Sequence, residues 1–418
     1  MIPPFVLTGS GRLFGFGSPW AIRVEGGRIA WVGAPLDAPP GDSVDLGTAL
    51  VTPGLVDAHT HPVFAGDRSD EVAARLAGAA YSEGGILRTV AATRAASDEA
   101  LLTLVEARLR SALAAGTTTI ECKSGYGLST AEELRALRLV RVAGERVGLR
   151  VVRTFMGAHA VPPEATSASD YARHVAEEML PAVANEADFC DVFCDAGFFS
   201  VTDAELVLGA ARSHGLGLRL HAEQLARTGA AELGVRLGAA SVDHLEQLDA
   251  AGVAALAASS TVATLLPGPA LVMRGGLPPG RALLDAGARV ALATDANAGT
   301  YASYSMPLVI GLGATLLGLT VEEALEAATA GGAAGLGLGE VTGAIRPGLA
   351  ADLVAWDAEH EGAFALHLGD VRPLRTWIGG VEIGQRPNQA ASRSVSKASF
   401  SAIASGEGSE SVTDGGAA

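Results

Sequence analysis

Short apolar runs alternate with longer amphipathic segments through the middle of the chain. Eight of the runs predict buried strands, because a strand covered on both faces carries an almost continuous apolar sequence. They are Leu55–His59, Thr117–Cys122, Arg150–Met156, Phe189–Cys194, Gly217–Leu220, Ala240–Asp243, Thr261–Leu266 and Val290–Ala293. Segments between them place apolar residues three and four positions apart, the helical period. These are Glu99–Ala114, Ala131–Val147, Tyr171–Ala184, Asp203–His214 and Gly229–Leu237.

Eight strands with helices between them predict an α/β fold, a (β/α)8 TIM-like barrel. A doubly wound open sheet is the alternative on periodicity alone. No glycine-rich dinucleotide motif follows the first strand, which disfavours the open sheet.

The two ends of the chain have a different pattern. Near the N-terminus, Trp20–Val24 and Arg28–Gly33 read as strands on either side of a Gly-Gly turn. Similar short runs return at Ala351–Trp356 and Thr376–Ile383. We therefore expect one small β-sandwich domain built from residues 1–50 and 345–388, and a barrel over residues 51–344. The Ser- and Gly-rich segment 390–418 predicts a disordered tail.

The composition indicates a folded protein and argues against several kinds of partner. Hydrophobic residues make up 49% of the chain and charged residues 18%, which supplies a large core. The formal charge of −16 disfavours nucleic acid and anionic membranes as partners. Three cysteines are too few for a disulfide framework and suit a reducing compartment. The chain shows no signal peptide and no apolar stretch of membrane-spanning length, so we expect a cytoplasmic protein.

The strongest local signal for chemistry is the pair His59 and His61 at the end of the first predicted barrel strand. Alternate side chains of a strand point the same way, so both imidazoles can reach one metal ion. Two histidines at a strand end can also make ordinary hydrogen bonds. Their position favours ligation, because barrel enzymes keep their active sites at the carboxyl ends of the strands.

Four further polar residues end predicted strands. They are His159, His221, His244 and Asp295. One histidine of this kind is more often structural, but a set of them at the same end of successive strands indicates a site. Imidazole and carboxylate ligands suit a divalent ion such as Zn²⁺ or Fe²⁺. Such an ion lowers the pKa of a bound water toward neutrality and so provides a nucleophile.

These features resemble the amidohydrolase superfamily, and within it the imidazolonepropionases, hydrolases of histidine degradation. The resemblance rests on several phrases in order between residues 50 and 300. They include HPVFAGDR at 61–68, ECKSGYGL at 121–128, TFMGAHAVPP at 154–163, DVFCD at 191–195, SVDHLE at 241–246 and TVATLLPG at 261–268.

The resemblance implies a role for individual residues. His59, His61, His221 and Asp295 match the ligands of a single metal ion, zinc or iron. Other positions match substrate contacts: Arg68 for a propionate, Tyr126 and His159 for the ring, Gln224, and the loop residues Asn297, Gly299 and Thr300. His244 matches a position close to the metal, as a hydrogen-bond partner for the carbonyl or the water. Arg68 suits its role physically, because an arginine presents two parallel N–H groups to a carboxylate.

One position departs from the family pattern, and a second one has a different role in some other members of the superfamily. Gln224 stands where many relatives carry a Glu that is thought to activate the water. A Gln cannot act as a base, so Asp295 is the candidate for the proton. Lys123 occupies a position where some superfamily members bridge two metals, and here we expect it to be structural.

The resemblance implies hydrolysis of the cyclic amide of 4-imidazolone-5-propanoate to N-formimidoyl-L-glutamate. Asp295, His244, His159 and Gln224 are then the candidate catalytic residues. The alternatives are another cyclic amidohydrolase, an aminohydrolase similar to guanine deaminase, and a non-catalytic barrel that serves as a scaffold. A homodimer is common in the superfamily, and the expected partner is otherwise only the small-molecule substrate.

Overall fold

The computed structural model describes residues 3–78 and 84–384. Its centre is an eight-stranded parallel sheet in which spatial order follows sequence order from β6 to β13. The strands are β6 (Leu55–Asp57), β7 (Thr117–Lys123), β8 (Arg150–Ala158), β9 (Phe189–Cys194), β10 (Gly217–Ala222), β11 (Ser241–His244), β12 (Val262–Leu265) and β13 (Val290–Leu292). All eight predicted barrel strands are confirmed, with shifts of a few residues at their ends.

The sheet closes just beyond its first and last strands. Asp295 N donates to the carbonyl of His59 at 2.9 Å, and His61 N donates to the carbonyl of Ala296 at 2.9 Å. A parallel bridge joins Thr60 to Ala296. The segments that carry His59, His61 and Asp295 are therefore the ones that close the barrel, and this places all three side chains at its carboxyl end.

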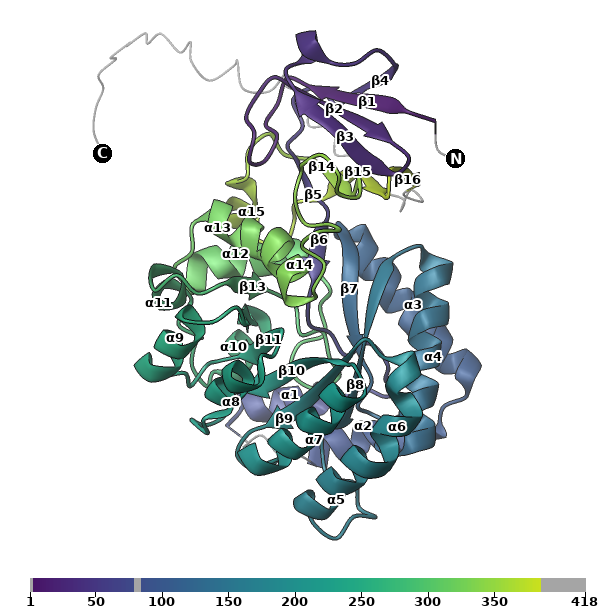
Figure 1. Ribbon diagram of the computed structural model, residues 1–418, viewed down its shortest axis with the longest axis vertical. Helices are drawn as coiled ribbons and strands as arrows, with labels where there is room; N and C mark the ends of the chain where they lie inside the picture. The colour runs from purple at the N-terminus through teal and green to yellow at the C-terminus, as the bar shows by residue number, and fades with distance from the viewer. Residues whose placement is uncertain (1–2, 79–83, 385–418) are drawn as a thin grey trace, which may run out of the picture. The chain divides into compact units, whose positions relative to one another are not determined.

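Helices lie outside the strands (Figure 1). The helices are α1 (Ser69–Leu76), α2 (Gly84–Ala95), α3 (Asp98–Ala114), α4 (Thr130–Val147), α5 (Ala168–His174), α6 (Leu180–Val183), α7 (Val201–Ser213), α8 (Ala230–Leu237), α9 (Ala250–Ala257), α10 (Pro267–Met273), α11 (Gly280–Asp285), α12 (Met306–Leu316), α13 (Val321–Glu326), α14 (Gly332–Gly335) and α15 (Ala363–Leu366). A π-helical turn, Val175–Met179, joins α5 to α6.

Local sequence sets the ends of several helices. Helix α7 begins with a capping box of Ser200 and Asp203, in which each side chain accepts a hydrogen bond from the other residue's backbone. Helix α4 ends at Gly148, which has φ +80°. Glycine adopts this left-handed conformation without steric cost, so it ends the helix there.

The chain ends form two further sheets. The first has the order β3-β2-β1-β4 and the second the order β16-β15-β14-β5. Their strands are β1 (Phe5–Gly9), β2 (Trp20–Glu25), β3 (Arg28–Gly33), β4 (Asp42–Asp45), β5 (Val51–Pro53), β14 (Leu353–Trp356), β15 (Pro373–Ile378) and β16 (Val381–Ile383). Figure 1 shows β1–β4 beside β14–β16.

A shared core joins these two sheets into a sandwich. Leu7, Trp20 and Ile22 of the first sheet belong to the same buried cluster as Leu353 and Trp377 of the second. The composite β-sandwich predicted from the sequence is thus confirmed as architecture. The domain boundaries at 1–50, 345–388 and 51–344 stay a prediction, and Val51–Pro53 pairs with β14 rather than with the barrel. The predicted tail, 390–418, lies outside the described residues.

Among the described residues, no helix combines the length and the apolar character that a membrane span requires.

Candidate metal centre and substrate pocket

Four side chains predicted as metal ligands meet at the carboxyl end of the barrel. The Nε2 atom of His61 lies 3.3 Å from Nε2 of His59 and 3.4 Å from Nε2 of His221. Oδ1 of Asp295 lies 3.4 Å from Nε2 of His61 and 3.6 Å from Nε2 of His59. All four side chains are buried. The structure therefore brings together the whole predicted ligand set.

Two further carboxylates fix which nitrogen of each imidazole faces this centre. Nδ1 of His59 lies 2.8 Å from Asp243, and Nδ1 of His221 lies 2.9 Å from Asp191. Because an ionised carboxylate only accepts hydrogen bonds, each Nδ1 carries the proton. The Nε2 atoms of His59 and His221 then present lone pairs to the centre, in the carboxylate–histidine pattern usual around metals.

This donor set fits a metal ion. Lone pairs and a carboxylate oxygen at these separations repel one another unless a cation lies between them. Ligands about 2.1 Å from a tetrahedral ion lie about 3.4 Å from one another. The observed separations of 3.3, 3.4 and 3.6 Å match this value. His59, His61 and Asp295 also form one of the groups able to hold an ion. The chemistry of this donor set therefore fits a divalent metal ion, and the assignment of these four residues as its ligands stays a prediction.

Burial sets the protonation of the ligands. It lowers the pKa of His59 and of His61 well below 6.5, and nearby positive groups such as Lys123 and the other imidazoles add to the effect. The imidazoles are thus neutral, the form that ligates. Burial raises the pKa of Asp295 to about 7. A cation beside this carboxylate favours its ionised form and opposes that shift.

A fully buried network of charges supports the two orienting carboxylates. Lys123 Nζ lies 2.8 Å from Asp191 and 2.7 Å from Glu121. Nη2 of Arg219 donates to Asp243 at 3.0 Å. Burial opposes ionisation of Asp191, but His221 and Lys123 outweigh it and hold the pKa of Asp191 well below its usual range. Lys123 thus lies behind the ligands and holds one of their partners.

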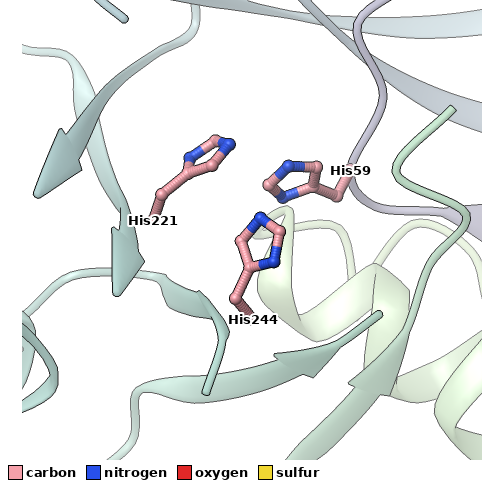
Figure 2. A group of neighbouring side chains, drawn as sticks. All are labelled: His59, His221 and His244. Carbon is pink, nitrogen blue, oxygen red and sulfur yellow. The ribbon is translucent and has the colours of Figure 1, made fainter. Parts of the chain in front are cut away.

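His244 is a fourth imidazole beside the same centre. Figure 2 shows the rings of His59, His221 and His244 approaching one another, and the three form a second possible metal-holding group. His244 has φ +83°, a left-handed conformation that is costly for a residue with a side chain. Burial lowers the pKa of His244, but the neighbouring carboxylates together outweigh it, Glu246 at 3.5 Å first and then Asp295 and Asp243, so the pKa is raised. A protonated His244 can donate to an oxygen that gains charge beside the metal.

The pocket next to the metal centre is lined by all of the predicted substrate residues except Gly299. Its lining comprises His61, Arg68, Ile86, Tyr126, His159, Phe193, His221, Gln224, His244, Asp295, Asn297 and Thr300. Its volume is about 30 Å³, room for one or two waters, so a substrate must displace water and move lining side chains to bind. A larger cavity of about 610 Å³ lies along Arg94, Leu128 and Tyr171, but none of the metal-binding side chains lines it. We therefore place the candidate active site in the smaller pocket.

Arg68 is a buried cation at the edge of this pocket. Its Nε and Nη2 atoms donate to the two carboxylate oxygens of Glu71, at 2.9 and 2.6 Å. Two glycines allow the guanidinium to lie there. A Cβ added at Gly299 would be 2.3 Å from Nη1, and one added at Gly85 would be 2.1 Å from Nη2. Gly299 therefore shapes the pocket by admitting Arg68.

Tyr126 and His159 form an aromatic wall. Their ring centroids are 5.1 Å apart, and His159 stacks on the metal ligand His61 at 5.2 Å. Burial, with a contribution from His221, lowers the pKa of His159 to about 3. His159 donates from Nδ1 to the carbonyl of Gly125 at 2.8 Å, so its Nε2 atom is left as an acceptor.

Asn297 organises its own loop. Its Oδ1 atom accepts from the backbone N–H groups of Gly299 and Thr300 at 2.7 and 2.8 Å. Its Nδ2 atom donates to the carbonyl of Asp295 and to Thr300 Oγ1, both at 2.6 Å. These bonds occupy the whole amide, so in this arrangement Asn297 shapes the loop beside the ligand Asp295. Direct contact of Asn297, Gly299 and Thr300 with a substrate stays a prediction.

The backbone of Gln224 is held by Asp195, whose carboxylate accepts from the N–H groups of Gln224, Leu225 and Ala226 at 2.7, 2.8 and 3.0 Å. Gln224 is among the residues that line the pocket, and its contact with a substrate stays a prediction.

Sequence reasoning missed five buried acidic residues that support the site: Asp191, Asp243, Asp195, Glu246 and Glu133. Asp191 and Asp243 had a readable signal, because each is a carboxylate inside an apolar strand, where an isolated charge is costly.

Comparisons with known proteins agree with this arrangement. Residues 50–383 match the Amidohydrolase family. A protein of Rubrobacter xylanophilus named imidazolonepropionase is 48% identical over 364 residues, which are 84% of this chain and 88% of that protein. One of Caulobacter vibrioides with the same name is 46% identical over 368 residues, 85% of this chain and 92% of that protein.

Solved structures agree in fold. A triazine hydrolase variant has a TM-score of 0.74 at 18% identity and covers 93% of this chain and 96% of its own. A zinc-bound adenosine deaminase of Xanthomonas campestris has a TM-score of 0.70 at 20% identity, over 90% of this chain and 92% of its own.

Proposed function

The chain belongs to the amidohydrolase family, and we propose that it hydrolyses 4-imidazolone-5-propanoate to N-formimidoyl-L-glutamate. Water adds across the cyclic amide: the bond between the ring carbonyl carbon and the ring nitrogen breaks. The carbonyl carbon becomes a new carboxylate and the nitrogen takes the proton. Relatives named imidazolonepropionase, 46% and 48% identical over 85% and 84% of the chain, support this function over the other activities of the family.

The buried position of Arg68 in the pocket is the main support for the substrate assignment. The substrate's propanoate takes no part in ring opening, so its recognition requires a cation close to the metal centre. Arg68 is buried and lines the same pocket as His61 and Asp295. We propose that it binds the propanoate while Glu71 holds the guanidinium in place.

His59, His61, His221 and Asp295 hold the metal in this proposal. A divalent ion held there would supply Lewis-acid chemistry, which would acidify a water and polarise the ring carbonyl. Asp295 accepts the water's proton and returns it to the leaving ring nitrogen. His244 donates to the carbonyl oxygen as negative charge develops on it. Tyr126, His159 and Gln224 orient the ring, and the loop of Asn297, Gly299 and Thr300 shapes the wall beside Arg68.

The fold alone would also suit two other enzymatic functions and one non-catalytic function. A different cyclic amidohydrolase, or an aminohydrolase similar to guanine deaminase, would use the same ligands but has no need for a buried arginine facing a substrate carboxylate. A scaffold without catalysis would be free to lose its ligands, and here the whole set is present and oriented.

Removal and return of the metal tests the proposal and also decides between zinc and iron. The protein is dialysed against a chelator, refilled with Zn²⁺ or Fe²⁺, and assayed by loss of the imidazolone absorbance. We expect activity to disappear with the metal and to return with one equivalent of the native ion per chain. Turnover that is unaffected by complete metal removal would contradict the proposal.

We also propose a cytoplasmic location, which the three buried cysteines without disulfides support. A homodimer stays a prediction, to be checked by the mass of the protein in solution.

A further inference from the structure

The segment Gly125–Leu128, between β7 and α4, carries Tyr126 into the pocket. Its backbone is not regular: Gly125 has φ +98° and Leu128 has φ +52°. The second of these is a conformation that a residue with a side chain adopts only when its surroundings enforce it. The surroundings of this loop must therefore hold its backbone in this conformation.

Glu133 binds the N–H groups of the loop. It is fully buried, one turn into α4, and its carboxylate accepts from the backbone of Gly125 at 2.8 Å, Gly127 at 2.9 Å and Leu128 at 2.8 Å. These three residues surround Tyr126 on both sides. A single carboxylate thus fixes the backbone from which the Tyr126 side chain projects.

Arg94 binds two carbonyl groups of the same loop. Its Nε atom donates to the carbonyl of Gly127 at 2.7 Å, and Nη2 donates to that of Leu128 at 3.2 Å. Its Nη1 atom pairs with Glu164 at 2.6 Å. Arg94 also lines the 610 Å³ cavity, so this side of the loop is the more accessible one.

Another carbonyl of the loop connects it to a second predicted substrate contact. The carbonyl of Gly125 accepts from Nδ1 of His159, which fixes the ring plane and the tautomer of that histidine. A shift of Gly125 would therefore move both Tyr126 and His159, the two residues that form the aromatic wall.

We propose that Glu133 and Arg94 are positioning residues that clamp the Gly125–Leu128 loop, one through its N–H groups and the other through its carbonyl groups, and so fix Tyr126 and His159 against the substrate ring. This inference rests on the proposed function, because Tyr126 and His159 contact an imidazolone only if that is the substrate. Neither Glu133 nor Arg94 lines the metal pocket, so both act through the loop backbone.

Two variants test the clamp. Glu133→Gln keeps the size of the side chain but places an amide NH₂ against backbone N–H groups. Arg94→Lys keeps the charge beside Glu164 but loses the fork over Gly127 and Leu128. We expect each to lower kcat/KM for 4-imidazolone-5-propanoate about 10-fold, the scale of one lost charge-assisted hydrogen bond. The change should lie mainly in KM, with metal content per chain unchanged.

A double-mutant cycle separates positioning from general loss of stability. If Glu133 acts through Tyr126, Glu133→Gln should cost much less in a Tyr126→Ala background than alone. Asp352→Asn is the matched control. Asp352 is also a buried carboxylate with a backbone donor, Gly379 N at 2.7 Å, but it lies beside β14, away from the pocket. It should lower the melting temperature and leave kcat/KM unchanged.

Each outcome is decisive. Losses that multiply in the double variant, or a loss of metal in Glu133→Gln, would overturn the inference while normal turnover by the unmodified chain upholds the proposed function. No turnover by the unmodified, metal-loaded chain would refute the proposed function and the inference with it. If Glu133→Gln does not fold, Arg94→Lys combined with Tyr126→Ala provides the same cycle from the more accessible side.

Discussion

Replacement of Arg68 by alanine removes the cation that we assign to the substrate's propanoate. In the structure, the guanidinium is buried and binds Glu71 through Nε and Nη2, and its Nη1 atom faces Gly299. Arg68→Ala therefore removes the cation and leaves the Glu71 carboxylate beside the place where a second carboxylate must bind. Arg75, 3.8 Å from Glu71, compensates that charge only in part.

The size of the expected loss in kcat/KM follows from the proposed ion pair between Arg68 and the propanoate. Truncation of one partner of a buried, hydrogen-bonded charge pair costs about 2–5 kcal/mol, which is about 30- to 5,000-fold in kcat/KM. Glu71 already shares the charge of Arg68, which places the loss near the lower part of this range. The repulsion from Glu71 then adds to it. We expect a loss of about 10²-fold or more for Arg68→Ala, with about one metal ion still bound per chain.

The assay compares two substrates: 4-imidazolone-5-propanoate and the same ring with a neutral propanamide. The unmodified chain should prefer the carboxylate, and Arg68→Ala should lose that preference. Arg68→Lys should recover only part of the activity, because an ammonium cannot reproduce the fork. Adding Glu71→Gln to Arg68→Ala should recover some turnover by removing the repulsion. Arg88→Ala is the control, because Arg88 is half-exposed and pairs with Asp70 on the surface.

Two results would refute the reasoning. If Arg68→Ala keeps its preference for the carboxylate substrate, another group binds the propanoate. If Arg68→Ala loses its metal, Arg68 supports the metal centre, and its role in recognition is unproven.

Two further predictions concern the groups behind the pocket. Asp191→Asn should weaken metal binding about 10- to 100-fold, because the amide no longer fixes the Nδ1–H tautomer of His221. Competition with a chelator measures the affinity, and an unchanged affinity would contradict the assigned hydrogen bond. The pKa of His159 is about 3 in the folded chain, against 6.5 for an exposed histidine. Between pH 3 and pH 6.5 the unfolded chain therefore binds more protons than the folded chain, so the free energy of unfolding falls as the pH falls. His159→Gln should reduce the loss of unfolding free energy between about pH 7 and pH 5 by about 2 kcal/mol in denaturant titrations, and an equal loss in both proteins would show that His159 is not buried neutral.

The barrel could be predicted from the sequence because its strands are covered on both faces. Each appears as a short apolar run such as Phe189–Cys194, and the helices between several of them show a clear apolar stripe. Other helices gave no such signal. α9 (Ala250–Ala257) and α12 (Met306–Leu316) consist almost entirely of small and apolar residues, so they have no polar face to mark the helical period.

The six candidate residues at the strand ends were also accessible from the sequence, because residues at the carboxyl ends of parallel strands meet at one edge. The choice of four of them as metal ligands came from the family resemblance and stays a prediction. Their supporting groups were not. Asp243 pairs with His59 across 184 residues, and Glu133 acts on Tyr126 only through backbone N–H groups. Such pairings depend on the register of strands and on the path of a loop, and spacing along the chain contains neither. The use of the Asn297 amide within its own loop likewise became visible only in three dimensions.

The most direct test of the central claim is a turnover of 4-imidazolone-5-propanoate in water enriched in ¹⁸O, with the product identified by mass spectrometry and NMR. We predict N-formimidoyl-L-glutamate with one ¹⁸O atom, located in the carboxylate that derives from the ring carbonyl, and no release of ammonia. Release of ammonia with the ring intact, or a ring that the metal-loaded protein leaves unopened, would contradict it.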